Sequence, residues 1–373
     1  MATPPNYHCL LNEVLSSIPL TTQSITNSYV TEQLNLETCP IVTVTSNEEA
    51  ASIRSQVQPS TASRPIAQVL EQANSIFSYR LFNHHPRFFG FLPGPSHPVT
   101  LLSDLLLSSK NPHAGSWSQS SGPSAIETGL IRWLAEAAGL AEETAGGLFV
   151  SGGSMANLVG LQVARDQVSR EEWEQRVKGI IYVSEQTRSS ITKGLRILGF
   201  NNKQVRKVRC DEEFSMSVPN LVIMIKGDRE KGLTPFLIVA SCGTTNTGSL
   251  HIDGAYSASI LLSKSHKHPH GISHADSISW DTRKWLFQTY GCGMVLLRNH
   301  SRLLQSFATG AEHTRDAADF GDFDTPNFWN FGSELTRLAR GMRSWFSLQV
   351  LGLDCVWGGL IMGLSWGRRL RRS

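Results

Sequence analysis

Hydrophobic positions follow two alternating patterns from about residue 80 onward. Segments 155–164 and 189–198 carry apolar side chains at helical spacing. Short apolar runs of strand length lie at 148–150, 180–183, 236–240 and 294–297. Repeated strand, helix, strand order predicts an α/β fold, with a mostly parallel sheet flanked by helices.

The first 75 residues differ in composition and in hydrophobic pattern. They are rich in Ser, Thr, Asn and Gln and show little periodicity, apart from one helix predicted at 66–77. We therefore expect an N-terminal extension over 1–75, followed by a large ligand-binding domain over 76–345.

The turns that follow the predicted strands are where chemistry is expected. In open α/β sheets, ligands bind where the parallel strands end. This rule selects the turns at 151–154, 184–188, 243–248 and 253–257.

Composition and charge exclude several classes of protein. The 373 residues are 40% hydrophobic and carry 34 Lys+Arg against 31 Asp+Glu, a net charge of +3, so the chain is neither disordered nor a nucleic-acid binder. The one basic cluster, at 368–372, is interpreted as solvated surface. Six dispersed cysteines without a CxxC pair indicate neither a disulfide scaffold nor a metal site.

Targeting signals are not evident. The N-terminus lacks the basic start and apolar core of a signal peptide. The apolar stretch at 350–364 contains Asp354 and is shorter than the about 20 residues that a bilayer requires. We expect a cytoplasmic protein that does not associate with a membrane.

The segment FVSGGSMANL, 149–158, runs from a strand through a Gly-rich turn directly into a helix. A helix N-terminus offers free N–H groups and a positive dipole end, so Gly152, Gly153 and Ser154 suit a phosphate. A Gly-rich turn without a ligand is the alternative.

A second motif, SISWDTRKW at 277–285, places Lys284 among aromatic side chains. A desolvated lysine has a lowered pKa and can form a Schiff base, although Lys284 alone could simply extend along the edge of the core. Asp253 lies between this motif and the Gly-rich turn. Lysine, carboxylate and phosphate turn together are what a protein supplies to pyridoxal phosphate.

With these residues in view, the chain resembles the group II pyridoxal-phosphate-dependent amino-acid decarboxylases over about residues 76–353. The matching segments, in family order, are HPRFFGFLPGP (85–95), Trp117 to WLAE (133–136), GGLFVSGGSMANL (146–158), YVSEQTRSS (182–190), PFLIVASCGTTNTG (235–248), HIDGAY (251–256), ADSISWDTRKW (275–285) and ELTRLARGMRSWFSLQVLG (334–352). The similarity is greatest to the branch that acts on aromatic amino acids. It implies the aminotransferase-like type I fold, a homodimer, and a C-terminal small domain of which 346–373 is a remnant.

The resemblance also implies roles for individual residues. Lys284 carries the cofactor as a Schiff base, and Asp253 pairs with the ring nitrogen. Gly152, Gly153 and Ser154 bind the phosphate, with Thr245 and Ala255 near the cofactor. Phe88, Phe89 and Trp117 form apolar walls for the substrate side chain, although each could equally be ordinary core.

Two arginines depart from the family pattern. Arg188 and Arg283 stand where the family has histidines, the first of which stacks on the cofactor and assists proton transfer. Arginine stays protonated near neutral pH, so it is not a general acid.

The connection to Asp253 also departs from the pattern. Only 246–249 separates GTT from LHIDGAY, whereas a parallel crossover needs about a dozen residues. This predicts either that Asp253 is displaced or that the preceding strand is frayed.

The expected function is decarboxylation of an aromatic L-amino acid to an amine in small-molecule biosynthesis. No tyrosine follows Tyr290, although many family members use a loop tyrosine to protonate the product carbanion. His313 is an available acid there, with surface histidine as the alternative. The competing hypotheses are an inactive paralogue with a structural or regulatory role and oxidative decarboxylation to an aldehyde.

Overall fold

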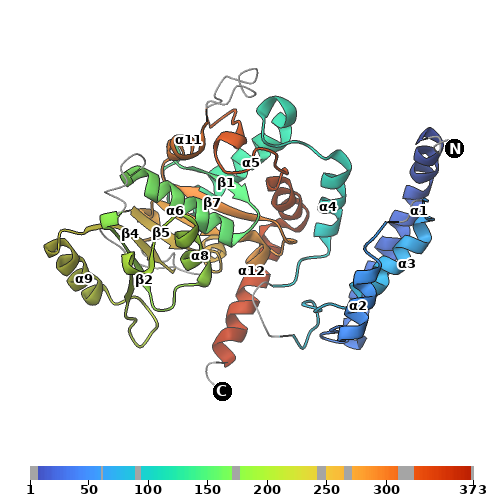
Figure 1. The fold of residues 1–373 in the computed structure, drawn as a ribbon, viewed down its shortest axis with the longest axis horizontal. Coiled ribbons are helices and arrows are strands. Elements are labelled where there is room, and N and C mark those ends of the chain that lie inside the picture. Colours follow the sequence, from blue (N-terminus) through green and yellow to red (C-terminus); the bar gives the residue numbers. More distant parts are fainter. Residues whose placement is uncertain are drawn as a thin grey trace. The chain divides into compact units, whose positions relative to one another are not determined.

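A computed structural model describes the protein over residues 7–59, 62–88, 94–169, 177–241, 249–263, 271–309 and 323–370. The chain divides into two compact units, Met1–Pro95 and Ser96–Ser373 (Figure 1). This division lies later in the chain than the boundary at residue 75 expected from the sequence.

The first unit is helical. Its helices are α1 (Tyr7–Leu34), α2 (Asn47–Ser55) and α3 (Ile66–Phe77), with a short 3-10 turn at Leu36–Thr38. The helix predicted at 66–77 is confirmed as α3. Helix α2 begins with a reciprocal cap, in which Ser46 accepts from the Glu49 N–H and the Glu49 carboxylate accepts from the Ser46 N–H. The sequence analysis predicted neither α1 nor α2.

The second unit contains a seven-stranded sheet in the order β1-β7-β6-β5-β4-β2-β3. The strands are β1 (Gly146–Val150), β2 (Gly179–Ser184), β3 (Val205–Val208), β4 (Thr234–Ala240), β5 (Ser249–Asp253), β6 (Ser277–Trp280) and β7 (Gly293–Leu297). All neighbours from β6 through β3 are parallel, and β7 is antiparallel to both β6 and β1. The predicted mostly parallel sheet is therefore confirmed.

Several helices of the second unit flank this sheet (Figure 1). The helices of this unit are α4 (Val99–Lys110), α5 (Trp117–Ala137), α6 (Gly153–Ser169), α8 (Ser189–Ile197), α9 (Val218–Glu230), α10 (Thr282–Trp285), α11 (Ser301–Phe307) and α12 (Gly341–Leu370), with 3-10 turns at Asn202–Gln204, Ala258–Leu262, Ile272–His274 and Phe328–Asn330. Helix α4 packs against α12 rather than against the sheet. Helix α6 contains the segment predicted at 155–164, and α8 matches the segment predicted at 189–198 except for its last residue.

Strand β2 shows how the sheet is buried on both faces. Ile181 packs in one apolar cluster with Ile191 of α8, whereas its neighbour Tyr182 packs in another with Leu221 of α9. Successive side chains of a strand point to opposite faces, so β2 is covered from both sides. This explains why the strand reads as a continuous apolar run rather than an alternating one.

The link between β4 and β5 corrects the expectation that Asp253 is displaced. Strand β5 lies in the sheet between β4 and β6, with Leu237 opposite Ser249 and Ala240 opposite Ile252. The connecting residues 241–248 need to return only about 10 Å along the strand direction, and eight residues can span about 26 Å. The expected displacement was wrong because only 246–249 were counted as the connection, whereas the connection begins at 241, directly after the strand predicted at 236–240 ends at Ala240.

Helix α12 is the one segment among the described residues that is long and apolar enough to cross a membrane by length and composition. The stretch that meets this test of length and composition is Gly341–Met362. The sequence analysis considered only 350–364. In the structure Gly352 interrupts the helix with φ 69° and ψ 161°. Before this break, Ser344 and Ser347 are buried and Arg343 pairs with Asp104 of α4. This first half is part of the packed second unit.

Candidate active site

The turn between β1 and α6 has the geometry of an anion site. Gly152 has a φ of 155°, which side-chain-bearing residues rarely adopt, and Gly153 is the first residue of α6. A Cβ at Gly293 would lie 2.5 Å from the Cα of Gly152, so β7 also approaches this turn closely. Gly152 and Gly153 are buried, and Ser154 is exposed in the first helical turn. The predicted phosphate residues therefore lie at the N-terminus of α6, where helix N–H groups can bind an anion.

Asp253 is the last residue of β5 and is buried. Its Oδ1 accepts from the Ala255 N–H at 3.2 Å and from the Ser279 hydroxyl at 3.3 Å. Its Oδ2 is buried and has no hydrogen-bond partner in the described structure. A buried carboxylate oxygen without a donor is costly, so this atom indicates a site for a donor that is not part of the chain.

The turns after β1 and β5 meet at one edge of the sheet. A Cβ built on Gly153 would lie 2.9 Å from the Cβ of Ala255 and 3.3 Å from Oδ2 of Asp281. Side chains that follow β5 and β6 thus converge on the N-terminus of α6, as expected for the carboxyl edge of a parallel sheet.

Lys284 lies in the single-turn helix α10 and is buried. Burial lowers the pKa of its amine below the ordinary value, and the positive charge of Arg188 lowers it further. The carboxylates of Asp281 and Asp253 act in the opposite direction. A lysine with a lowered pKa is more often a free amine, which is the nucleophilic form.

Arg283 is paired with Asp281 rather than extended into the site. Its Nε lies 3.1 and 3.0 Å from the two carboxylate oxygens of Asp281, and its guanidinium lies 5.1 Å from the ring centre of Tyr290. Oδ2 of Asp281 also lies 3.4 Å from the Gly153 N–H. The arginine therefore neutralises a carboxylate that stands beside the predicted phosphate turn.

Arg188 precedes α8 at the end of β2, and its side chain is exposed. The guanidinium carbon lies 5.8 Å from the ring centre of Tyr256, which in turn contacts the ring of Trp285 at 5.4 Å. Its charge reaches Lys284, since it contributes to the lowered pKa of that amine. The structure thus brings Arg188 to the same edge as Lys284 and Asp253.

A buried polar network that the sequence analysis missed lies beneath this edge. His251 is fully buried, with Nδ1 2.8 Å from the Ser277 hydroxyl and Nε2 2.9 Å from Oδ1 of Asn157. Asn157 donates in turn to Ser190 of α8. Burial lowers the pKa of His251 to about 4, so the imidazole is neutral near pH 7. The motif HIDGAY was singled out for Asp253. The role of His251 left no local signal, because its partner Asn157 lies 94 positions away in the sequence.

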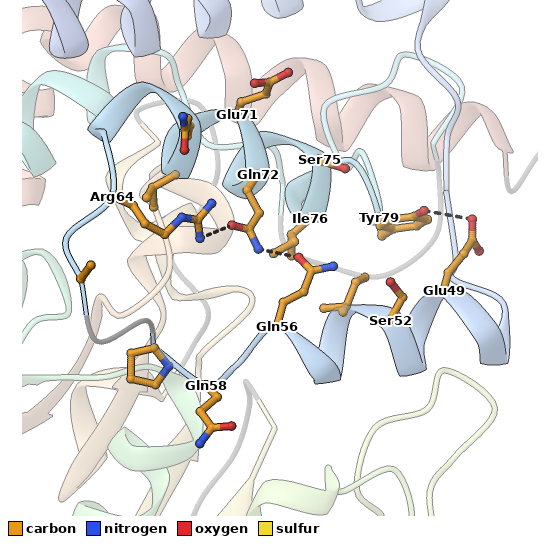
Figure 2. Close-up of a pocket in the computed structure, with 15 residues that line it drawn as sticks. Glu49, Ser52, Gln56, Gln58, Arg64, Glu71, Gln72, Ser75, Ile76 and Tyr79 are labelled. Atoms are coloured by element: carbon orange, nitrogen blue, oxygen red, sulfur yellow. Dashed lines mark hydrogen bonds between the residues drawn. The ribbon is translucent and has the colours of Figure 1, made fainter.

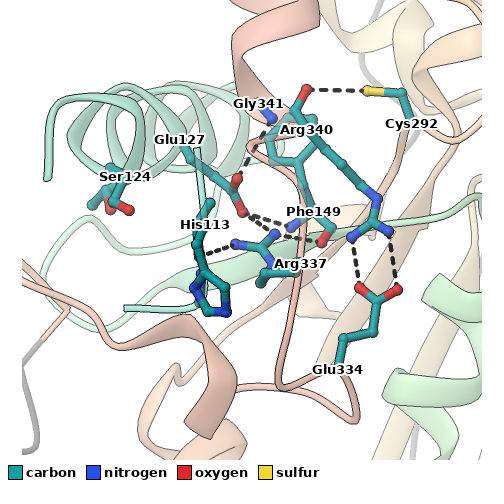
Figure 3. Close-up of polar contacts among 12 residues, drawn as sticks. His113, Ser124, Glu127, Phe149, Cys292, Glu334, Arg337, Arg340 and Gly341 are labelled. Carbon is teal, nitrogen blue, oxygen red and sulfur yellow. Dashed lines mark hydrogen bonds and ion pairs between the residues drawn. The ribbon is translucent and has the colours of Figure 1, made fainter. Parts of the chain in front are cut away.

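A second missed network joins β1 to α12 (Figure 3). Glu127 of α5 and Arg337 form an ion pair at 2.6 Å in which both side chains are 1% exposed. Glu127 also accepts from the Phe149 N–H, and Arg337 donates to the Phe149 carbonyl at 2.8 Å. Arg340 pairs with Glu334 nearby. These contacts hold the strand that leads into the Gly-rich turn.

Several further residues were predicted to belong to this site. Thr245, Phe89 and His313 lie outside the described residues. Phe88 belongs to the first unit and is half-buried, and Trp117 is half-buried at the start of α5. Their roles as substrate walls therefore remain predictions from the resemblance.

A polar groove in the first unit contains none of the predicted site residues (Figure 2). It lies along α2 and α3, where Arg64 donates to Gln72 and Gln72 donates to Gln56. Across the described ranges, no group of three or more His, Cys, Asp or Glu side chains is arranged to hold a metal ion.

The residues present at the sheet edge fit pyridoxal phosphate. The N-terminus of α6 suits the phosphate, the unpartnered Oδ2 of Asp253 suits a protonated ring nitrogen, and Lys284 supplies an amine of lowered pKa. The phosphate, the ring nitrogen and the aldehyde of the cofactor thus each have a matching group in the chain.

Comparisons with known proteins agree with this fit. The family model described as the pyridoxal-dependent decarboxylase conserved domain matches residues 51–356. The aromatic-L-amino-acid decarboxylase of Bacillus atrophaeus is 37% identical over 297 residues, which cover 75% of this chain and 61% of that protein. The 4-hydroxyphenylacetaldehyde synthase of Rhodiola rosea is 26% identical over 295 residues, covering 72% and 59%. The chain thus spans about three fifths of the length of these relatives.

Solved structures share the fold. The crystal structure of Oryza sativa TDC with PLP and tryptamine superposes with a TM-score of 0.82 at 22% identity, covering 96% of this chain and 77% of that chain. The expected type I fold is confirmed.

Proposed function

Because this chain belongs to the pyridoxal-dependent decarboxylase family, we propose that it removes the α-carboxylate of an aromatic L-amino acid as carbon dioxide and releases the amine. The observation that carries the proposal is the buried, unpartnered Oδ2 of Asp253 at the same sheet edge as Lys284. A carboxylate in this position favours a protonated ring nitrogen. Pyridoxal phosphate, when bound, supplies an electron sink for the charge left on Cα.

The chain's own residues hold and orient the reacting groups. Gly152, Gly153 and Ser154 would bind the phosphate through the N-terminus of α6. Lys284 would bind the cofactor carbon through Nζ, and its lowered pKa favours the free amine that this requires. Asp253 would hold a proton on the ring nitrogen.

Support for an aromatic substrate comes from the relatives. The Bacillus atrophaeus protein, at 37% identity, is an aromatic-L-amino-acid decarboxylase. Phe88, Phe89 and Trp117, whose apolar side chains would suit an aromatic ring, correspond to substrate positions of that branch. We further propose a cytoplasmic homodimer that serves small-molecule biosynthesis.

Oxidative decarboxylation to an aldehyde is the second candidate. Arg188, which remains charged near neutral pH, stands at the site where a proton donor for Cα would be expected. Without such a donor, the charge left on Cα would stay available to dioxygen. The amino acid, O2 and water would then give the aldehyde, carbon dioxide, ammonia and hydrogen peroxide. The Rhodiola rosea relative is an aldehyde synthase.

Product analysis separates these functions. Purified protein loaded with pyridoxal phosphate is incubated with L-phenylalanine, L-tyrosine or L-tryptophan, and carbon dioxide, amine, aldehyde and peroxide are measured, with Lys284→Ala as the control. Amine without peroxide supports simple decarboxylation, and aldehyde with equimolar peroxide supports the second candidate. Cofactor binding without any product would contradict both and favour an inactive paralogue with a structural or regulatory role.

A further inference from the structure

Strands β5 and β6 carry two matched polar pairs on one face of the sheet. His251 lies opposite Ser277, and Asp253 lies opposite Ser279. Each serine hydroxyl contacts its β5 partner, at 2.8 Å for Ser277 and 3.3 Å for Ser279. Both serines are buried, so neither hydroxyl can turn to water instead. The two pairs differ in that only Asp253 has an unpartnered oxygen.

The contacts of Asp253 fix the direction of that oxygen. A carboxylate can rotate about its Cβ–Cγ bond, which would exchange or tilt its two oxygens. Here Oδ1 is held by two donors that come from different directions, the Ala255 N–H and the Ser279 hydroxyl. Because Oδ1 is held, Oδ2 keeps one orientation.

We propose that Ser279 is a positioning residue, which holds Oδ1 of Asp253 so that Oδ2 is presented to the ring nitrogen of pyridoxal phosphate. The Ala255 N–H alone would leave the carboxylate free to tilt, since a single hydrogen bond restrains one oxygen only. A tilted carboxylate would contact the ring nitrogen less closely and would favour its protonated form less.

The proposal predicts a cofactor-specific effect of removing the hydroxyl. Ser279→Ala should weaken the binding of pyridoxal phosphate about tenfold, because a tilted carboxylate would lose its charged hydrogen bond with the ring nitrogen, and such a bond is worth about 1.5 kcal/mol at the low end of its range. The 1-deaza analogue, in which a C–H replaces the ring nitrogen, should bind wild type and Ser279→Ala equally. Dissociation constants are measured by tryptophan fluorescence and absorbance titration, without substrate.

Ser277→Ala is the matched control, because Ser277 is a buried serine of the same strand that contacts His251 instead of Asp253. It should leave the ratio of the two dissociation constants at its wild-type value. Ser279→Cys, which keeps the side-chain size but donates weakly, should resemble Ser279→Ala. If Ser279→Ala weakens both cofactors equally, Ser279 only packs the sheet and the proposal is wrong.

A double variant tests whether the effect passes through Asp253. In an Asp253→Asn background, Ser279→Ala should cause no further cofactor-specific loss, because the carboxylate that it orients is already absent. A further tenfold loss there would contradict the mechanism. A wild-type protein that binds both cofactors equally would contradict it as well.

The role of Ser279 rests on the family's cofactor and deepens the proposed decarboxylation. The two proposals can nevertheless be refuted independently of each other. A protein that discriminates the two cofactors and releases no carbon dioxide refutes the proposed function and leaves the role of Ser279 standing. A decarboxylase in which Ser279→Ala changes neither dissociation constant refutes the role of Ser279 alone.

Discussion

Removing one partner of the Glu127–Arg337 ion pair should destabilise the second unit strongly. Both side chains are 1% exposed, so Glu127→Ala leaves the Arg337 charge buried without its carboxylate. Breaking a buried pair in this way costs about 3–5 kcal/mol. The Phe149 N–H loses its acceptor as well, so we expect a loss of about 4–5 kcal/mol. This is a large share of the about 5–15 kcal/mol by which a domain is stable.

Replacing both partners should cost much less than the sum of the single changes. In Glu127→Leu combined with Arg337→Met, no charge remains buried, although the Phe149 N–H and carbonyl still lose their partners. We therefore expect a favourable coupling of about 2–3 kcal/mol in the cycle formed by this double variant and its two single variants, Glu127→Leu and Arg337→Met. Urea unfolding followed by circular dichroism gives the free energies.

An exposed pair on the same helix supplies the control. Arg132 of α5 pairs with Asp324, and their side chains are 40% and 67% exposed. Asp324→Ala should cost less than about 1 kcal/mol, because water replaces the lost partner. If Glu127→Ala costs as little as Asp324→Ala, or if the cycle is additive, the reasoning from burial is refuted.

Three further outcomes are expected. Lys284→Ala should abolish the visible absorption that bound pyridoxal phosphate acquires in the wild type; an unchanged band would remove Lys284 from the mechanism. Arg188→His should raise amine formation, because a general acid of suitable pKa contributes about 10²–10⁴-fold to the rate. Arg283→His should raise it less. If neither variant gains activity in a protein that binds the cofactor, the inactive paralogue is favoured. Acidification from pH 6.5 to 4 should lower the free energy of unfolding by about 3 kcal/mol through His251, since the unfolded chain binds a proton that the folded chain excludes. His251→Gln should flatten this part of the pH profile in urea titrations, and an unchanged slope would assign it to other groups.

The sequence predicted the parts of the fold that depend on local pattern. The apolar runs at 148–150 and 236–240 became β1 and β4 because buried strands leave a continuous apolar signature. Helix α1 was missed because its Ser, Thr and Asn residues and its internal Pro19 disfavour a helix locally. Tertiary context overrides such weak preferences.

The candidate site was predictable where each of its residues lies in a short, recognisable motif. The Gly-rich turn, Asp253 and Lys284 each lie in a motif of about ten residues, and the fold brings them to one edge of the sheet. The pairs His251–Asn157 and Glu127–Arg337 were not predictable, because their members are 94 and 210 positions apart. Ser279 was visible in its motif, but its role depends on which β5 residue lies opposite, and that register appears only in the sheet.

The antiparallel strand β7 has a consequence for how the chain folds. Ala240 meets Ile252 after 12 positions, whereas Gly146 meets Leu297 only after 151. Closing the longer loop costs about 2 kcal/mol more in chain entropy. Strand β1 should therefore join the sheet late, after β7 has been synthesised and has found β6. Because the Gly-rich turn directly follows β1, the end of the candidate site that is predicted to bind phosphate should be completed near the end of folding. The cofactor should therefore bind to a nearly folded chain and should not direct the earlier steps of folding.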